Sequence, residues 1–324
     1  MQQARKEDVT VSGSVRHLRI GDEAAGQRLD NYLFKQLKGV PKSRVYRMLR
    51  EGEVRVDGHR AKPELRLEAG NEVRIPPARV ARADAPPAQA RIQRSLLDRV
   101  LYRDDALLAL DKPAGQAVHG GSGVSLGIIE QLRREMPQQR FMELAHRLDK
   151  ETSGILLIAL KRAALVELHR MLRAGETRKT YLALALGGWH GRQRHVRLAL
   201  RKYHTGEGER RVAVDAEGQA AHTVFTLRRR HEGFSLLEAE LKTGRTHQIR
   251  VHLAALGHPI AGDDKYGDFE RNRELVRQGL RRMFLHAARL ELRHPLNDVP
   301  LRLESPLPDD LQGFLDSLPP DTTP

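Results

Sequence analysis

Residues 78–94 interrupt the chain with an aperiodic run rich in Ala, Pro, Arg and Gln that includes two adjacent prolines. A run of this composition forms neither an amphipathic helix nor an alternating strand, and it behaves as a semi-rigid spacer. The periodic sequence on its two sides must therefore fold as separate units. We expect a flexible tail over residues 1–17, a small module over 18–80, a linker over 81–99, a larger domain over 100–316 and a disordered tail over 317–324.

The small module has the pattern of two helices followed by short strands. Residues 27–37 carry leucines at helical spacing, and Pro41 stands where the first turn of a second helix tolerates proline. Asp57-Gly58 is a strong signal for a two-residue turn, and residues 72–75 alternate polar and apolar as a half-buried strand does. About 60 residues of this kind make a binding module and not an enzyme core.

The larger domain mixes strands with helices and predicts an α+β fold. Residues 100–102 and 106–110 flank a short polar turn, which indicates a hairpin. The longest apolar stretch is 155–160, which predicts a buried strand and is far shorter than the ~20 residues that cross a bilayer. The first eight residues are polar and lack the apolar run of a signal peptide. We therefore expect a cytoplasmic protein without a membrane partner.

Composition narrows the chemistry further. The sequence contains no cysteine, which excludes disulfides, zinc ribbons, iron–sulfur clusters and thiol nucleophiles. Its 56 Lys and Arg outnumber its 42 Asp and Glu, and the net charge is +14. Such an excess favours a polyanionic partner, because each cation that meets a phosphate releases condensed counterions. A nucleic acid fits this charge, and a solvated basic surface is the alternative explanation.

The positive charge is concentrated in the small module. Between residues 35 and 66, ten Lys or Arg stand against four Asp or Glu. Lys42, Arg44 and Arg47 surround the second helix, whose N-terminus also favours a phosphate, and acids at i+4 that would neutralise a solvated face are missing from it. We interpret these three cations as a phosphate-binding face. The stretch resembles the small RNA-binding module first known from ribosomal small-subunit protein four.

One polar segment of the larger domain points to chemistry. His146-Arg147-Leu148-Asp149-Lys150-Glu151-Thr152-Ser153-Gly154 leads directly into the apolar run 155–160. A loop of this kind places charged side chains at the edge of a packed sheet. From its residues alone, Asp149 is either a reactive carboxylate or a cap or salt-bridge partner.

The same segment resembles the signature of the RluA-type pseudouridine synthases, and further motifs of that family follow in order. They are Asp111-Lys112-Pro113-Ala114-Gly115, Val118-His119-Gly120-Gly121-Ser122-Gly123, Lys179-Thr180-Tyr181-Leu182-Ala183, Thr243-Gly244-Arg245-Thr246-His247-Gln248-Ile249-Arg250-Val251-His252, Gly262-Asp263-Asp264-Lys265-Tyr266-Gly267 and Leu285-His286-Ala287. The resemblance implies the pseudouridine synthase fold, with a mixed and mainly antiparallel sheet. It also implies an isomerase that converts uridines of large-subunit (23S) ribosomal RNA to pseudouridine. This reaction oxidises nothing and loses no group, so we expect no cofactor, and we expect the protein to be a monomer.

The resemblance also assigns catalytic roles. Asp149 corresponds to the aspartate that acts at the ribose, either by attacking C1′ or by taking a proton from C2′. Arg245 corresponds to the arginine that pairs with this aspartate and favours its charged form. Tyr181 corresponds to the tyrosine that stacks on the flipped base, although its position in a strand also suits simple core packing.

Substrate-binding residues follow from the same motifs. Arg147 corresponds to the arginine that enters the RNA helix in place of the flipped uridine, a task that suits a planar guanidinium. Leu148 and Ile249 are expected to line the pocket, and both also suit packing. The basic segment 192–211 would extend the RNA footprint around the site.

Two other functions compete with the isomerase. A non-catalytic ribosome-assembly factor explains the charge and the small module, but it gives no reason for the motifs of the larger domain. A metal-dependent nuclease would use Asp111, Asp263 and Asp264, although adjacent acids in a Gly-rich loop are more often turn formers. His247 and His252 are five apart and do not share a helix face, so we predict no metal site.

Overall fold

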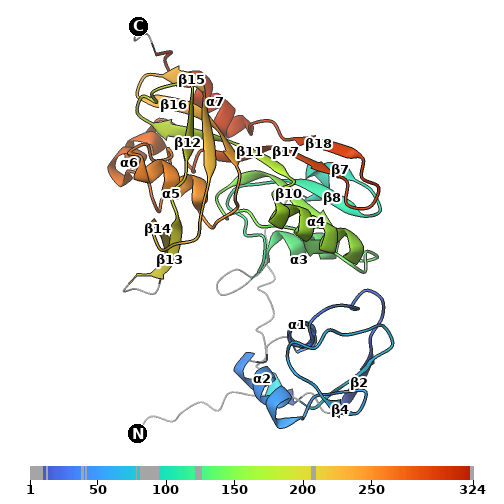
Figure 1. Cartoon of the computed structure of the whole chain (residues 1–324). Helices are drawn as coiled ribbons and strands as arrows, with labels where there is room; N and C mark the ends of the chain where they lie inside the picture. The colour runs from blue at the N-terminus through green and yellow to red at the C-terminus, as the bar shows by residue number, and fades with distance from the viewer. Residues whose placement is uncertain are drawn as a thin grey trace. The chain divides into compact units, whose positions relative to one another are not determined.

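The structure is a computed structural model that describes residues 10–11, 14–37, 40, 42–77, 79–80, 95–120, 126–205 and 209–321. The chain divides into two compact units, residues 1–92 and 93–324 (Figure 1). Each unit has its own hydrophobic core, the first within residues 20–75 and the larger one within residues 96–315. None of the helices in these described ranges is long and apolar enough to span a bilayer.

The first unit packs helices against a small antiparallel sheet. Its helices are α1 (Leu29–Gln36) and α2 (Lys42–Glu51), and its sheet has the order β2 (Arg16–Arg19), β5 (Glu72–Ile75), β3 (Arg55–Val56) and β4 (His59–Arg60). Leu33 of α1 and Met48 of α2 are fully buried in its core. Asp57 and Gly58 have φ of 49° and 79°, as the tight turn between β3 and β4 requires. A separate pair joins β1 (Thr10–Val11) to β6 (Arg79–Val80).

Two boundaries of the expected tail and linker differ from the structure. Strand β2 begins at Arg16, inside the expected tail, because this segment pairs with β5. At the other boundary, Leu96 is buried in the second unit and its backbone N–H donates to the carboxylate of Glu135. The expected linker therefore ends before Leu96. The part of it over residues 81–94 lies outside the described residues.

The second unit is built on a ten-stranded sheet with the order β12, β15, β16, β11, β17, β10, β8 and β7, extended by β18 on β17 and β9 on β10. The strands are β7 (Val100–Arg103), β8 (Leu107–Lys112), β9 (Glu143–Leu144), β10 (Ser153–Ala159), β11 (Arg178–Leu186), β12 (Gln193–Val196), β15 (Thr223–His231), β16 (Phe234–Leu241), β17 (Leu285–Arg293) and β18 (Pro300–Glu304). Strands β10 and β17 pair in parallel, and the other neighbouring strands described in this sheet pair antiparallel. The expected α+β fold with a mixed, mainly antiparallel sheet is confirmed.

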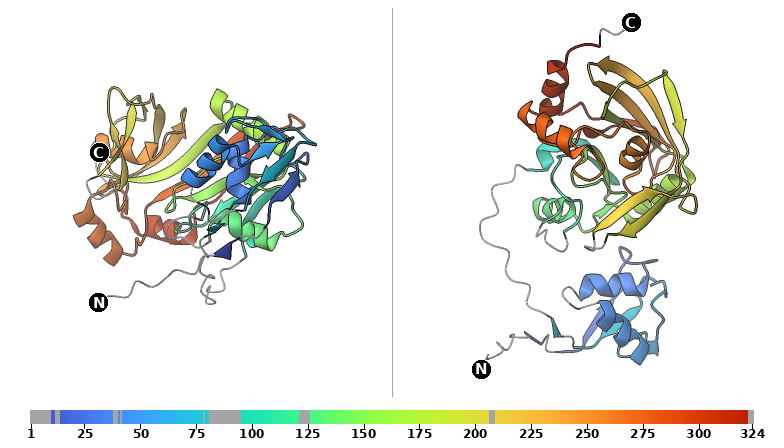
Figure 2. Two further views of the ribbon diagram at one scale, coloured as in Figure 1. Left: turned by 90° about the horizontal axis from the view of Figure 1, so that it is seen from below. Right: turned by 90° about the vertical axis from the view of Figure 1, so that its left-hand side faces the viewer.

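Helices cover this sheet, and a hairpin stands beside it. They are η1 (Leu97–Arg99), α3 (Ile128–Glu135), α4 (Arg162–Ala174), α5 (Gln248–Ala255), α6 (Phe269–Arg277) and α7 (Asp309–Ser317), and the hairpin is β13 (Leu200–His204) with β14 (Arg210–Val214). Helix α5 contacts β14 and β15 and lies within the curve of the sheet (Figure 2). Beyond α7, Leu318 still packs on the core, so the expected C-terminal tail is shorter, and residues 322–324 lie outside the described range.

Strand β10 is buried along its whole length because helices cover both of its sides. Ile155 and Leu157 pack in one cluster with Leu168 of α4. Leu156, which points the other way, packs in a second cluster with Leu132 of α3. The loop that precedes β10 is thus held at the edge of a rigid core. This is the loop that contains Asp149.

Candidate active site

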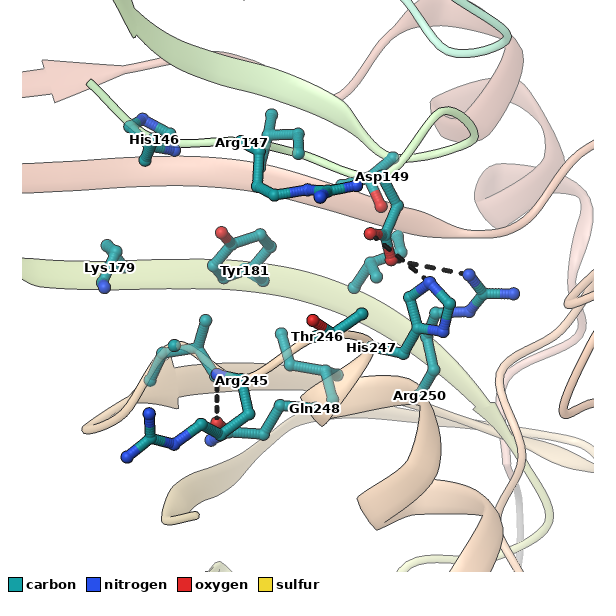
Figure 3. A pocket seen from close by; sticks show the side chains of 16 residues that line it. His146, Arg147, Asp149, Lys179, Tyr181, Arg245, Thr246, His247, Gln248 and Arg250 are labelled. Carbon is teal, nitrogen blue, oxygen red and sulfur yellow. Dashed lines mark hydrogen bonds and ion pairs between the residues drawn. The ribbon is translucent and has the colours of Figure 1, made fainter. Parts of the chain in front are cut away.

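A cavity of about 250 Å³ opens at the centre of the sheet in the second unit. It is lined by the loop before β10, the first half of β11, and the turn into α5 with the first turn of that helix (Figure 3). Leu241 at the end of β16 and Leu285 at the start of β17 complete the lining. Asp149 reaches the cavity from the loop before β10, and Tyr181 reaches it from β11. Segments distant in sequence therefore place a carboxylate, an aromatic ring and several cations around one space.

Buried contacts hold the loop that contains Asp149. The ammonium group of Lys112 donates to the carbonyl oxygens of Pro113, Gln116 and Lys150, at 2.7, 2.8 and 3.0 Å. Lys112 is fully buried, and this burial lowers its pKa to about 7. The Lys-Pro motif thus ties the residue after Asp149 to the end of β8, which fixes the loop.

A glycine allows the central strands to approach closely. Gly154 has φ of 104°, and a Cβ added to it would lie 2.3 Å from the carbonyl oxygen of Ala287. Only glycine tolerates both conditions, so the parallel contact between β10 and β17 depends on it. Next to it, Ser153 Oγ lies 2.9 Å from Nδ1 of His286, whose Nε2 faces the carbonyl oxygen of Ser305. The glycine and histidine of these motifs support the sheet beneath the site.

The cation beside Asp149 is Arg250, in the first turn of α5. Its Nη1 lies 3.5 Å from Oδ2 of Asp149, and Nε2 of His247 lies 3.7 Å from Oδ1 (Figure 3). The side chain of Asp149 is 19% exposed, whereas that of Arg250 is 6% exposed. A buried cation thus lies within ion-pair distance of a partly exposed carboxylate.

A buried carboxylate fixes the orientation of Arg250. Nε and Nη2 of Arg250 donate to the two oxygens of Asp263 at 2.7 Å each. Asp263 also accepts the backbone N–H groups of Lys265 and Tyr266. Burial acts to raise the pKa of Asp263, but the hydrogen bonds and charge of Arg250 outweigh it and hold that pKa below its ordinary value. This bidentate pair leaves Nη1 directed at Asp149.

A short hydrogen-bond chain leads from the β13–β14 hairpin to His247, whose Nε2 lies 3.7 Å from Asp149. The backbone N–H of Val212 donates to the hydroxyl of Tyr266 at 3.0 Å, and that hydroxyl lies 2.7 Å from Nδ1 of His247. Burial raises the pKa of Tyr266 to about 12, so the hydroxyl keeps a proton to donate to Nδ1. We therefore assign the ring proton of His247 to Nε2, the nitrogen that faces Asp149. Burial lowers the pKa of His247, which favours this neutral form.

The opposite part of the cavity is aromatic and cationic. Tyr181 on β11 is 8% exposed, and burial together with the charge of Asp149 raises its pKa. Lys179 lies two residues earlier on the same strand, and burial lowers its pKa. His146 accepts the backbone N–H of Leu157 on Nε2 at 3.1 Å, and burial lowers its pKa to about 4. Tyr181 is thus a neutral ring at the edge of a space that fits a base.

The structure places the other motif residues in two groups. Leu148 and Ile249 are 5% and 4% exposed and form part of the cavity wall. Arg147 is exposed and stands at the mouth of the cavity beside Asp149 (Figure 3). A long cation at the mouth can meet the RNA from which the target base has been withdrawn.

The expected pairing of Arg245 with Asp149 was wrong. Nε of Arg245 donates to the carbonyl oxygen of Ala220 at 3.1 Å, and its guanidinium points away from Asp149 (Figure 3). The turn before α5 explains the different directions of the two arginines. The side chain of Gln248 accepts the backbone N–H of Arg245 and holds this residue in the turn, whereas Arg250 lies on the helix itself. Two arginines of one motif are thereby directed to different places.

The expected phosphate-binding face of the first unit also needs correction. Nη1 and Nη2 of Arg44 donate to the two oxygens of Glu53 at 2.9 Å each, so this cation is paired within the unit. The expected lack of acids at i+4 was wrong as well, because Glu51, the last residue of α2, stands four residues after Arg47 and lies 3.8 Å from Arg44. Glu53 lies just beyond the end of the helix. Arg47 is exposed on α2. Lys42 is the first residue of α2, and its side chain is not among the described ones.

The acids of the alternative nuclease are engaged elsewhere. Asp111 accepts the hydroxyl of Ser305 and pairs with Arg99, while Asp263 is bound to Arg250. In the described part of the chain, no three His, Asp or Glu side chains are grouped so that they could hold a metal ion. These aspartates are therefore structural partners and not an assembled ligand set.

Comparisons with known proteins agree with this geometry. The model of the RNA pseudouridylate synthase family matches residues 106–255, and the S4 domain model matches residues 27–73. Ribosomal large subunit pseudouridine synthase C of Escherichia coli is 50% identical over 313 residues, covering 95% of this chain and 98% of that protein. Its namesake in Pasteurella multocida is 46% identical over 316 residues, covering 97% of each. This chain belongs to the RNA pseudouridine synthase family.

Solved structures show the same fold for this synthase. Human RNA Pseudouridylate Synthase Domain Containing 4 superposes with a TM-score of 0.57 at 26% identity, over 68% of this chain and 93% of that one. Human RNA Pseudouridylate Synthase Domain Containing 1 gives a TM-score of 0.56 at 27% identity, over 68% and 87%. The resemblance expected from the motifs is thus confirmed at the level of the family.

Sequence reasoning missed three residues of the synthase site. They are Arg250, His247 and Tyr266, which surround or support Asp149. One signal could have indicated Arg250. Asp263-Asp264 is an acid pair in a Gly-rich loop, and if either acid is buried it needs a cationic partner such as an arginine of another motif. Spacing gives no comparable signal for His247, whose orientation depends on a backbone φ of 54°.

Proposed function

We propose that this synthase converts uridines of large-subunit (23S) ribosomal RNA into pseudouridines, with Asp149 as the carboxylate that acts at the ribose. The names of relatives at 46–50% identity support the substrate, as do the S4 domain and the net charge of +14. One observation carries the assignment of the carboxylate. Asp149 stands in a cavity of about 250 Å³ within 3.5 Å of a buried, fixed guanidinium.

The chemistry of the reaction matches what the residues can do. The N1–C1′ bond breaks, the uracil turns, C5 bonds to C1′, and the proton of C5 is lost while N1 gains one. No electrons are gained or lost overall, so the residues need only bind, orient and move protons. Attack on C1′ and removal of the C2′ proton are both reactions of a carboxylate, and Nη1 of Arg250 lies 3.5 Å from that of Asp149.

The remaining residues of the cavity position the base. A uridine inside an RNA helix must be flipped out to reach a pocket at the centre of the sheet. The ring of Tyr181 offers a stacking surface, and Leu148 with Ile249 provides apolar walls. Arg147 at the mouth can occupy the space left in the RNA and contact its phosphates.

The proposal is tested by Asp149→Asn, which keeps the shape and removes the charge. Tritium release from 23S transcripts labelled at C5 of uridine should fall by at least about a hundredfold, while RNA affinity stays near that of the wild type. Asp105→Asn is the matched control, because its side chain is 97% exposed on the surface. An Asp149→Asn variant that turns over within tenfold of the wild type would exclude this residue as the reactive carboxylate. It would also remove the main argument against a non-catalytic assembly factor.

We further propose that the enzyme acts in the cytoplasm as a monomer and without a cofactor. The redox-neutral reaction supports the lack of a cofactor, and the absence of cysteine fits a reducing compartment. Light scattering should give a mass of 36.6 kDa, and full activity should persist in excess chelator. A dimer mass would contradict the monomer. Loss of activity with the chelator would contradict the lack of a cofactor and favour metal-dependent chemistry.

A further inference from the structure

A second cavity adjoins the candidate active site. It has a volume of about 400 Å³ and lies between the β13–β14 hairpin, the turn at residues 217–219 and the turn before α5. Gly244, Arg245 and Thr246 line both cavities, so the two spaces share one wall. A nucleotide in the first cavity is bonded to its neighbours in the RNA. The RNA backbone next to this nucleotide must therefore pass close to residues 244–246, at the opening of the first cavity.

The charges of the second cavity fit a phosphodiester. Its lining side chains include three cations, Arg201, Lys202 and Arg245, and one carboxylate, Glu217. Arg201 is already paired, with Asp215 at 3.2 Å and with Glu217 at 3.8 Å. Among the described residues, neither Lys202 nor Arg245 has a carboxylate within ion-pair distance. Two uncompensated cations thus face this space.

Arg245 is held in a way that suits a phosphate ligand. Its Nε donates to the carbonyl oxygen of Ala220, which fixes the guanidinium plane against the turn. The two terminal nitrogens, which form the fork that matches a phosphate, point away from Asp149 (Figure 3). The arginine that does not pair with Asp149 is therefore already oriented for another anion.

The walls do not suit a stacked base. No aromatic side chain is among the residues that line the second cavity in the described part of the chain. Its apolar residues, Leu200 and Val212, are buried in a small cluster of their own. Stacking on an aromatic ring supplies much of the affinity for an unpaired base, so these walls favour the sugar–phosphate backbone.

We propose that the second cavity is a backbone subsite in which Arg245 and Lys202 bind the phosphodiester of a nucleotide next to the target uridine. This rests on the proposed function, because it requires RNA in the first cavity. Gly244 contributes only backbone to the wall that the two cavities share. The subsite would hold the strand so that the flipped uridine reaches Asp149 in one register.

The test compares Arg245→Met and Lys202→Met with Arg173→Met, whose exposed arginine on α4 lines neither cavity. Binding of the full chain to a 23S transcript is measured at several salt concentrations, followed by single-turnover tritium release at saturating RNA. For Arg245→Met we expect the Kd to rise about tenfold and the salt slope to fall by about one, because one charged phosphate contact is lost. The saturating rate should fall by much less than the affinity. Arg173→Met should match the wild type.

Arg245→Lys is the rescue variant, because it restores the charge without the fork and should recover the salt slope more fully than the affinity. An unchanged Kd and slope for Arg245→Met would overturn the subsite. A collapse of its saturating rate equal to that of Asp149→Asn would also overturn it, by placing Arg245 in the chemistry. The wild type is measured first on the same transcript. Failure of the wild type to release tritium would count against the proposed function itself. If the wild type is active and Arg245→Met binds RNA with an unchanged Kd and salt slope, only the subsite is refuted.

Discussion

Replacing Arg250 by Met should damage the synthase in two separable ways. The substitution leaves Asp263 buried and without its partner, and removing one member of a buried ion pair costs about 3–5 kcal/mol of folding free energy. Two backbone N–H groups still bind Asp263, so we expect the lower end of this range. The same change removes the cation 3.5 Å from Asp149. Because Asp149 is partly solvated, we expect about 2–3 kcal/mol in the barrier, roughly a hundredfold in rate.

A double variant separates the two effects. In Arg250→Met/Asp263→Asn no unpaired buried charge remains, so about 2 kcal/mol of the lost folding free energy should return. The rate should stay low, because Asp149 still lacks its cation. The stability of the second unit can be followed by fluorescence, since Trp189 is the single tryptophan of the chain and is 1% exposed. Single-turnover tritium release reports the rate.

Two results would refute this reasoning. A double variant that regains both stability and rate would mean that Arg250 acts only through the fold. An Arg250→Met variant destabilised by less than about 1 kcal/mol would mean that its pair with Asp263 is not a desolvated charge pair. Asp105→Asn again serves as the control for a surface carboxylate.

Three further predictions follow from the same contacts. Tyr266→Phe removes the hydroxyl between Val212 and His247, and it should slow single-turnover tritium release about tenfold. The variant should also alter the acid limb of the pH–rate profile, whereas a purely structural role would leave that limb unchanged. Burial lowers the pKa of His146 to about 4 in the folded state, so the unfolded chain binds this proton first as the pH falls, and the free energy of unfolding should fall by up to about 3 kcal/mol between pH 6.5 and pH 4. In His146→Gln the urea-unfolding midpoint should depend less on pH over that range, and an unaltered pH dependence would contradict the assignment. In the first unit, Arg47→Ala should lower the salt slope of RNA binding by about one, while Arg44→Ala should mainly cost about 0.5–1 kcal/mol of stability; the reverse pattern would restore Arg44 as a phosphate ligand.

Local sequence patterns determined the elements of this fold. Strand β5 spans Glu72–Ile75, the residues that alternate polar and apolar. All but the last residue of the apolar run 155–160 lies in β10, which is buried on both sides. Helix α4 ends at Gly175, which has φ of 73° and caps it. Such features depend on neighbouring residues, so the chain by itself specifies them.

The motif order also identified the family and the loop that contains Asp149, but not the partners of its charges. Arg250 lies 101 positions from Asp149, and Glu53 pairs with Arg44 across the end of a helix. Whether Arg245 or Arg250 faces Asp149 depends on the turn into α5, where His247 has φ of 54°. Side-chain direction at such a turn follows from backbone angles that residue spacing does not specify. Only the tertiary structure decides it, because the buried carboxylate of Asp263 orients one arginine and the carbonyl of Ala220 holds the other.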